Sequence, residues 1–326
     1  MDRFLEELDM PTFVNGMARG SIEPDSDRFL NRARTPALGR SDCVLVFGTP
    51  FDFRLGYGQP PKFNPDASVI QVDLDPEEVG RNRDVAVGIV GDTGLVMEGL
   101  CDSIDERGGM NDLDSWWETV HEIEDQKWEP MREQMSSDEE PINPLRLCAE
   151  VNEFIDSDTI VIGDGGDFVA TAAYTLEVEG LGNWMDPGPL GTLGVGPGYA
   201  MAAKLTHPDS DVVIMYGDGS FGFNGMEFDS MVRQGIDVVG IMGNDACWRQ
   251  IKRGQVDMYG EERAVATDLA ETRYDQVVEG LGGHGEHVQS IDELHGALER
   301  AFATDLPALV NVEIGESDFR EGSISV

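Results

Sequence analysis

The chain alternates short apolar runs with amphipathic stretches over most of its length. Six runs have the length and composition of buried parallel strands: residues 43–48, 68–73, 159–162, 212–216, 238–242 and 308–312. Most are followed by a loop rich in Gly, Pro, Asp or Asn, and helical patterns lie between them, for example at residues 96–104 and 168–176. Strands that alternate with helices predict an α/β fold with doubly wound parallel sheets.

The same pattern divides the chain into three parts. Residues 1–105 form one predicted domain and residues 145–326 a second. Residues 106–144 are polar and partly helical, and we interpret them as a helical, acidic linker with an exposed segment at 136–141. Trp116, Trp117 and Trp128 lie in this linker, where we expect them to pack rather than to stack on nucleic-acid bases.

Two loops of the second domain carry the candidate chemistry. Gly217-Asp218-Gly219 follows one predicted strand, and Asn244-Asp245 follows the next. A right-handed crossover returns the second strand beside the first, so both loops are expected at one sheet edge, where α/β proteins bind ligands. Two oxygen-bearing side chains would converge there, as a hard divalent cation requires. Glycines on both sides of Asp218 would let a diphosphate approach the backbone.

Local signals place the start of the intervening helix near Asn224. Asn224 is a suitable N-cap, and Glu227 three residues later completes a capping-box pattern. Phe223 and Phe228 have the spacing of a hydrophobic staple.

The charge balance narrows the range of partners. The chain has 63 acidic and 23 basic residues, a formal net charge of −40. Such a field repels phosphate backbones and anionic lipids, so nucleic acid and membrane surfaces are not expected partners. Acidic residues are spread along the whole chain, which is typical of proteins in the cytoplasm of a halophile, where salt screens the repulsion between them.

Several other classes of protein are excluded. No apolar run reaches the ~18 residues of a membrane span, and the N-terminus does not resemble a signal peptide, so we expect a cytoplasmic protein. The four cysteines are widely spaced and predict reduced thiols.

Residues 194–199 lack the last glycine of a dinucleotide-binding fingerprint, and no Gly-Lys pair exists for a P-loop. His284 and His287 lie among glycines, which favours a solvated loop over a metal site.

The segment from Gly217 to Asp245 resembles the thiamine-diphosphate signature, which opens with Gly-Asp-Gly and closes with two asparagines. The resemblance implies that Mg²⁺ is bound by Asp218, by Asp245 in the usual register, and by the backbone carbonyl of Cys247. Because an aspartate replaces the second asparagine, the resemblance leaves open whether Asn244 or Asp245 faces the metal.

The resemblance to acetolactate synthase-like enzymes covers nearly the whole chain. Residues 188–196 are similar to the segment that cradles the thiamine, and Leu193 would hold the cofactor bent. Residues 17–20, 42–48 and 52–55 look like the middle domain, so 1–105 would be a partial middle domain. Within the family, residues 184–188, 243–246 and 318–325 most resemble 2-hydroxyacyl-CoA lyases. The implied cofactor-binding residues are Gly165, Gly166, Asp167, Phe168, Gly191, Thr192, Leu193, Gly217, Gly219 and Ser220.

The resemblance also implies thiamine diphosphate and Mg²⁺ as cofactors, with FAD or a CoA-type nucleotide as further candidates for the middle domain. Family members have an N-terminal domain whose glutamate activates the aminopyrimidine ring, and Glu6 and Glu7 do not match it. We therefore expect either a separate pyrimidine-domain subunit in a homo-oligomeric enzyme, or a fragment. The enzyme would make or cleave a carbon–carbon bond next to a carbonyl in a 2-oxo acid or a 2-hydroxyacyl-CoA. The alternative is a non-catalytic cofactor-binding or interaction module.

Overall fold

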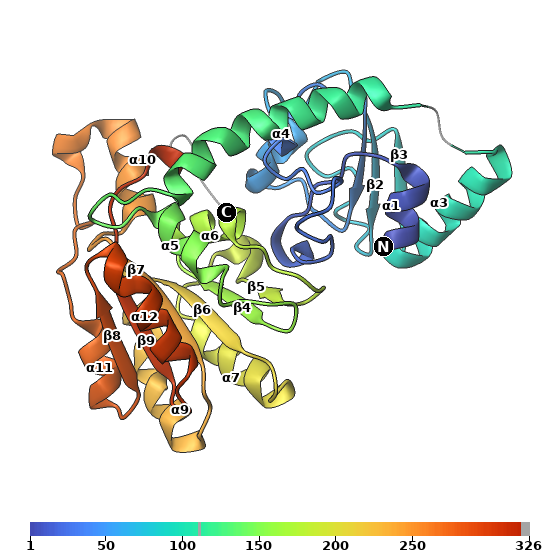
Figure 1. Ribbon diagram of the computed structural model, residues 1–326. Helices are drawn as coiled ribbons and strands as arrows, with labels where there is room; N and C mark the ends of the chain where they lie inside the picture. Colours follow the sequence, from blue (N-terminus) through green and yellow to red (C-terminus); the bar gives the residue numbers. More distant parts are fainter. Residues whose placement is uncertain (110–111, 321–326) are drawn as a thin grey trace. The chain divides into compact units, whose positions relative to one another are not determined.

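Parallel strands build both sheets of the protein, as the apolar runs predict (Figure 1). The structure, a computed structural model, describes residues 1–109 and 112–320. It divides into a first unit, Met1–Asn15 with Asp25–Glu129, and a second unit, Gly16–Pro24 with the chain from Pro130 onward. Of the C-terminal segment 318–325 used in the sequence comparison, residues 321–325 lie outside the described part.

The first unit contains a sheet of order β1-β2-β3, in which all strands are parallel. Val44 and Val46 of β1 face a core with Phe51, while Leu45 and Phe47 face the packed helices α1 and α3. This alternation is the period of two that a strand buried on both faces shows. The elements are α1 Asp2–Leu8, η1 Gly16–Ala18 (of the second unit), α2 Arg34–Leu38, β1 Cys43–Phe47, η2 Phe53–Gly58, β2 Ser68–Asp73, β3 Val87–Val90 and α3 Thr93–Arg107.

Helix α4, Asp114–Met135, occupies most of the predicted linker. Trp116 and Trp117 pack against a small core that includes Val120, and Trp128 lies under the guanidinium of Arg32. All three tryptophans therefore serve packing, as expected. Residues 136–141, after α4, are mostly exposed and lie within the second unit.

The second unit is built on a six-stranded sheet of order β5-β4-β6-β7-β9-β8. Helices α5, α6 and α12 cover one face, and α7, α9 and α11 cover the other. The elements are α5 Pro144–Val151, β4 Ile160–Asp164, α6 Asp167–Thr175, β5 Trp184–Met185, η3 Gly188–Leu190, α7 Gly196–Thr206, β6 Val212–Gly217, α8 Asp218–Asn224, η4 Gly225–Glu227, α9 Phe228–Gln234, β7 Val239–Asn244, α10 Arg249–Tyr259, η5 Glu261–Arg263, α11 Tyr274–Gly280, β8 His284–Val288, α12 Ile291–Phe302, β9 Ala308–Glu313 and η6 Asp318–Arg320. Both sheets are parallel and flanked by helices, which confirms the predicted α/β class.

The register of the central strands brings the candidate loops to one edge. Asp164 pairs with Tyr216, Gly217 with Gly243, and Asn244 with Glu313, so β4, β6, β7 and β9 end side by side (Figure 1). The loops that follow these strands therefore meet, as the crossover rule predicts.

The predicted helix start at Asn224 is right in position, because η4 begins at Gly225 and continues into α9 at Phe228, but the predicted capping by the Asn224 side chain is wrong. Helix α8 begins directly after β6, at Asp218, with Gly217 as its N-cap. The Asn224 side chain does not cap a helix but donates to the carbonyl of Gly194 at 2.6 Å. Phe223 is exposed and contacts Trp248, so it does not staple Phe228 either. A contact distant in sequence outweighs the local capping signal here.

The predicted loop around His284 and His287 is also wrong, because both residues lie in β8 at the edge of the sheet. Their rings bond to carboxylates, His284 Nε2 to Glu286 at 2.8 Å and His287 Nε2 to Glu313 at 2.9 Å.

None of the described helices is both long and apolar enough to cross a membrane.

Candidate functional site

Asp218 lies at the junction of β6 and α8 and is 3% exposed. Its Oδ1 accepts a hydrogen bond from the Gly219 amide at 2.8 Å, and its Oδ2 accepts one from the Cys247 amide at 3.1 Å. Burial, together with the negative charge of Asp245, raises the pKa of Asp218 to about 7 in spite of these bonds. The folded chain thus holds a carboxylate whose negative charge is costly unless a cation joins it.

Asp245 follows β7 and supplies the second carboxylate. Arg249 donates its Nε–H to Asp245 Oδ2 at 2.7 Å and also pairs with Glu316. Burial raises the pKa of Asp245, against the lowering effect of the Arg249 guanidinium. Two mostly buried carboxylates at neighbouring strand ends are the donor type that Mg²⁺ prefers.

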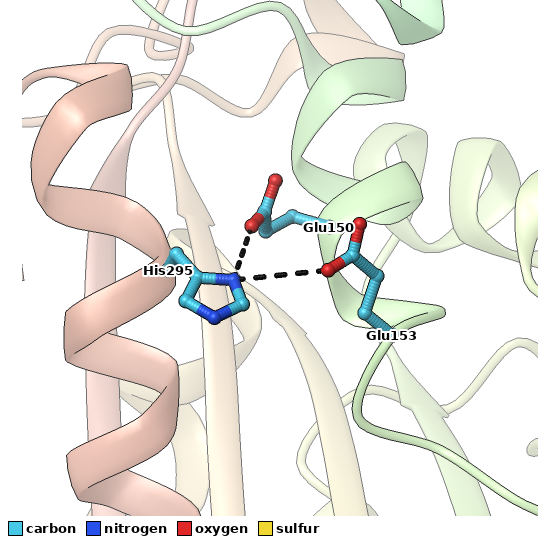
Figure 2. Close-up of side chains that lie close together, drawn as sticks. All are labelled: Glu150, Glu153 and His295. Carbon is cyan, nitrogen blue, oxygen red and sulfur yellow. Dashed lines mark hydrogen bonds and ion pairs between the residues drawn. The ribbon is translucent and has the colours of Figure 1, made fainter.

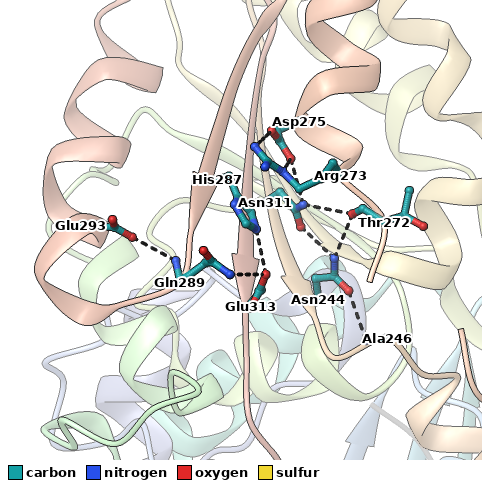
Figure 3. Close-up of polar contacts among 10 residues, drawn as sticks. All are labelled: Asn244, Ala246, Thr272, Arg273, Asp275, His287, Gln289, Glu293, Asn311 and Glu313. Carbon is teal, nitrogen blue, oxygen red and sulfur yellow. Dashed lines mark hydrogen bonds and ion pairs between the residues drawn. The ribbon is translucent and has the colours of Figure 1, made fainter. Parts of the chain in front are cut away.

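The Asn244 side chain takes part in a different set of contacts (Figure 3). Its Nδ2 donates to Asn311 Oδ1 at 3.0 Å, and its Oδ1 accepts from the Ala246 amide at 3.2 Å. The charge that acts on Asp218 is that of Asp245. Of the two residues that the sequence left open, Asp245 thus acts on Asp218, whereas both ends of the Asn244 amide bind other protein groups.

The loop at residues 165–168 lies beside the end of β6. A Cβ on Gly165 would come within 2.8 Å of the Gly217 nitrogen, and one on Gly166 within 2.7 Å of Gln250 Oε1. Asp167 begins α6 and pairs with Arg253 of α10. The Phe168 side chain is 6% exposed and belongs to the core under β7, so only its backbone is available to a ligand.

The loop before α7 is fastened by Asp164, the last residue of β4. Its Oδ1 accepts from the Gly194 amide at 2.8 Å and its Oδ2 from the Gly196 amide at 2.7 Å. Gly194 has φ +82°, and a Cβ there would lie 2.7 Å from Phe223 Cβ, so this turn needs glycine. Ahead of this anchor, Gly191 and Thr192 are exposed and Leu193 is half-buried.

Asp164 and Asn224, which shape this loop, were not predicted as site residues. Burial raises the pKa of Asp164 although two backbone amides bind its carboxylate. The sequence does carry a signal for it, since Gly163-Asp164-Gly165 repeats the Gly-Asp-Gly pattern of residues 217–219 after another buried strand.

Gly219 and Ser220 have structural partners of their own. A Cβ on Gly219 would lie 2.6 Å from the Trp248 ring, so this glycine makes room for the tryptophan. The Ser220 hydroxyl donates to the Gly217 carbonyl at 2.8 Å and to that of Asp164. These contacts hold the ends of β4 and β6 together and fix the frame of the site.

Two family models match the chain. Residues 164–312 match the "Thiamine pyrophosphate enzyme, C-terminal TPP binding domain", and residues 1–100 match the "Thiamine pyrophosphate enzyme, central domain". The first match contains the strand-end loops at 164–168, 188–196, 217–220 and 244–247.

Curated relatives agree with these matches. A "Probable acetolactate synthase" of Mycobacterium bovis is 41% identical over 310 residues, covering 95% of this chain and 55% of the relative. "2-hydroxyacyl-CoA lyase 2" of Danio rerio is 38% identical over 332 residues, covering 99% and 52%. The human protein of the same name is 36% identical over 333 residues, covering 99% and 51%. The chain thus spans about half the length of the curated relatives it matches.

Proposed function

Because the chain belongs to the thiamine pyrophosphate enzyme family, we propose that it binds the diphosphate of thiamine diphosphate through Mg²⁺ at the strand-end loops of the second unit. The observation that carries the proposal is the pair of buried carboxylates, Asp218 and Asp245, whose mutual repulsion a divalent cation would relieve. Asp218, Asp245 and the backbone carbonyl of Cys247 are the proposed ligands.

Three loops around this pair have proposed roles in holding the cofactor. The backbone amides of residues 165–168, at the start of α6, and of residues 217–220 favour the diphosphate oxygens. Residues 191–193 lie next to the anchored turn at Gly194, and Leu193 provides an apolar contact for the thiamine. Asp164, Ser220 and Asn224 fix the frame of these loops through their hydrogen bonds.

We propose further that the chain is part of an enzyme that makes or cleaves a carbon–carbon bond next to a carbonyl. Bound thiamine diphosphate supplies the electron sink for such a reaction. The relatives named as acetolactate synthase and 2-hydroxyacyl-CoA lyase support a 2-oxo acid or a 2-hydroxyacyl-CoA as substrate. The two matched family models are the central and C-terminal domains, so we assign ring activation to a pyrimidine-binding module outside these 326 residues.

Calorimetric titration of the purified chain with thiamine diphosphate tests the binding proposal. We expect binding with Mg²⁺, and little or none with a chelator or in Asp218→Ala. Asp209→Ala is the matched control, because Asp209 is an exposed aspartate in the loop before β6, at the opposite ends of the strands. Equal affinity with and without metal, or an equal loss in both variants, would contradict the proposal.

Turnover assays with the pyrimidine-binding module present then separate the two substrate classes. Activity on pyruvate favours the first class, and cleavage of a 2-hydroxyacyl-CoA favours the second. Metal-dependent binding with neither activity would favour the non-catalytic module. The visible spectrum of the purified protein tests for FAD in the central-domain part.

A further inference from the structure

Three buried polar side chains, Asn244, Asn311 and Asp275, lie close together near Ala246, and we call them the amide bridge (Figure 3). They are 6%, 1% and 2% exposed, respectively. Asn244 ends β7, Asn311 lies in the neighbouring strand β9, and Asp275 lies in the first turn of α11. Polar groups are costly to bury unless they are hydrogen-bonded, so a bridge of this kind calls for a structural or functional reason.

The surroundings of Asn311 fix which way its amide points. Its Nδ2 donates to Asp275 Oδ1 at 3.2 Å and to the Thr272 carbonyl at 3.3 Å. Arg273 holds the Asp275 carboxylate with bonds of 3.0 and 2.6 Å. Because both partners of the Nδ2 are acceptors, Oδ1 of Asn311 must face Asn244. There it accepts the Asn244 Nδ2 at 3.0 Å.

This bond, together with a longer contact of the same Nδ2 with the Thr272 carbonyl at 3.5 Å, fixes the amide of Asn244. With its Nδ2 directed at Asn311, its Oδ1 is left facing the loop and accepts the Ala246 amide at 3.2 Å. Ala246 has φ +49°, a left-handed conformation that alanine adopts only when its surroundings impose it. The next amide, that of Cys247, then donates to Asp218 Oδ2 at 3.1 Å. A continuous series of short contacts thus links Asn311 to Asp218.

We propose that Asn311 is a positioning residue for metal binding. It orients Asn244, and Asn244 holds the turn at Ala246 that keeps Cys247 against Asp218. The inference rests on the proposed function of Asp218, Asp245 and Cys247 as metal ligands, and it assigns Asn244 to shaping the loop rather than to the metal. Asn311 lies one strand away from the ligands and acts through the loop.

The test is a titration of the full chain with Mn²⁺ at saturating thiamine diphosphate, with free Mn²⁺ followed by electron paramagnetic resonance. Asn311→Leu keeps the size of the side chain and removes its hydrogen bonds. We expect it to raise the apparent Kd of the metal roughly tenfold, the effect of one lost hydrogen bond to the loop. If Asn311→Leu does not fold, Asn311→Thr replaces it, because threonine suits a strand and its hydroxyl is too short to reach Asn244.

The matched control is Asn152→Leu. Asn152 also makes two amide hydrogen bonds, to the Thr175 carbonyl at 3.0 Å and from the Glu177 amide at 3.0 Å, but at the far end of α6. It should lower the melting temperature and leave the metal Kd unchanged. A double-mutant cycle adds a readout that a merely structural role would not move: in an Asn244→Ala background, Asn311→Leu should have little further effect on the metal Kd.

The outcomes separate this inference from the proposed function. If the unmodified chain shows no metal-dependent binding of the cofactor, the proposed function fails and the inference fails with it. If the unmodified chain binds and Asn311→Leu binds the metal equally well, only the inference is overturned. Equal effects of Asn311→Leu in both backgrounds would also overturn it, because Asn311 would then not act through Asn244.

Discussion

Asp218 and Asp245 are like charges held close to one another at the ends of adjacent strands. The chain itself offsets part of the repulsion, since two backbone amides bind Asp218 and Arg249 binds Asp245. The pKa of Asp218 is still raised to about 7, so the offset is incomplete. This residual cost is what a divalent cation would remove, and it distinguishes the pair from aspartates in ordinary turns.

At this scale we predict that an oxygen at position 245 matters more than its charge. Asp245→Asn recreates the asparagine of the family signature and should keep metal-dependent binding of thiamine diphosphate. Asp245→Leu, of similar size, should raise the apparent Kd of the metal by roughly tenfold or more. A Mn²⁺ titration at saturating cofactor measures both variants. Equal losses in the two would show that residue 245 does not supply a metal ligand.

Helices α5 and α12 are joined by an ionic cluster on the surface of the second unit (Figure 2). His295 of α12 bonds through Nδ1 to Glu150 of α5 at 2.7 Å and lies 3.8 Å from Glu153. Its Nε2 lies 3.7 Å from Glu299, and Arg146 also pairs with Glu150 at 2.6 Å. The hydrogen bond to Glu150, supported by the charges of all three glutamates, raises the pKa of His295 above 6.5.

The link between these helices should therefore weaken as the pH rises. A histidine whose pKa is raised in the folded state stabilises the fold fully below its unfolded pKa of ~6.5, and this contribution is lost as the pH passes the folded pKa. The melting temperature of His295→Gln should fall below that of the unmodified chain at pH ~5.5 and approach it at pH ~9. His207→Gln, at an exposed histidine after α7, is the control. A difference that does not vary with pH would rule out protonated His295 as the source.

The whole molecule carries a formal net charge of −40, from 63 acidic and 23 basic residues. Self-repulsion of this size opposes the compact state, and dissolved salt screens it because the Debye length falls to about 3 Å at 1 M. The acidic residues are distributed along the chain, so both units should respond.

We therefore predict that stability depends on salt. The melting temperature, measured by circular dichroism, should rise by ~5 °C or more between ~0.1 and ~2 M KCl. Sucrose at equal osmolality is the control, because it stabilises proteins without screening charge. An unchanged melting temperature in KCl, or an equal rise in sucrose, would contradict a role for charge screening.

The chain matches two domain models of the family, the central domain and the C-terminal TPP binding domain. Because we propose that a pyrimidine-binding module activates the ring of thiamine diphosphate, the 326-residue chain should bind the cofactor without activating it. Hydrogen–deuterium exchange at C2 of the bound cofactor should match that of the free cofactor. It should accelerate only when a pyrimidine-binding domain of an acetolactate synthase-like relative is added. Fast exchange, or turnover by the purified chain, would refute the division of labour.

The apolar runs allowed most of the fold to be predicted, but not its polar or short strands. The central strands β4, β6, β7 and β9 are buried on both faces, so their composition alone identified them. Strand β8 has the sequence His-Gly-Glu-His-Val, and its side chains find their partners in other elements, such as Glu313 and Arg300. Strand β5 has only two residues, and β3 has an apolar sequence but is short and largely exposed, so neither was among the predicted strands.

The sequence by itself determined which residues would come to the candidate site. Gly217 and Asn244 end buried strands and Asp218 and Asp245 follow them directly, and parallel strands in register must end at one edge. It could not determine what each side chain does there. Consecutive residues at a strand end point in different directions, and the choice between them depends on partners far along the chain. Asn311, 67 residues after Asn244, accepts a hydrogen bond from the Asn244 side chain, and Asp245 remains beside Asp218. The carbonyl of Gly194, 30 residues before Asn224, likewise accepts a hydrogen bond from the Asn224 side chain, which local signals assign to a helix cap. Only the tertiary structure brings such partners together, because hydrogen bonds between buried polar groups are decided by distance in space and not by spacing in sequence.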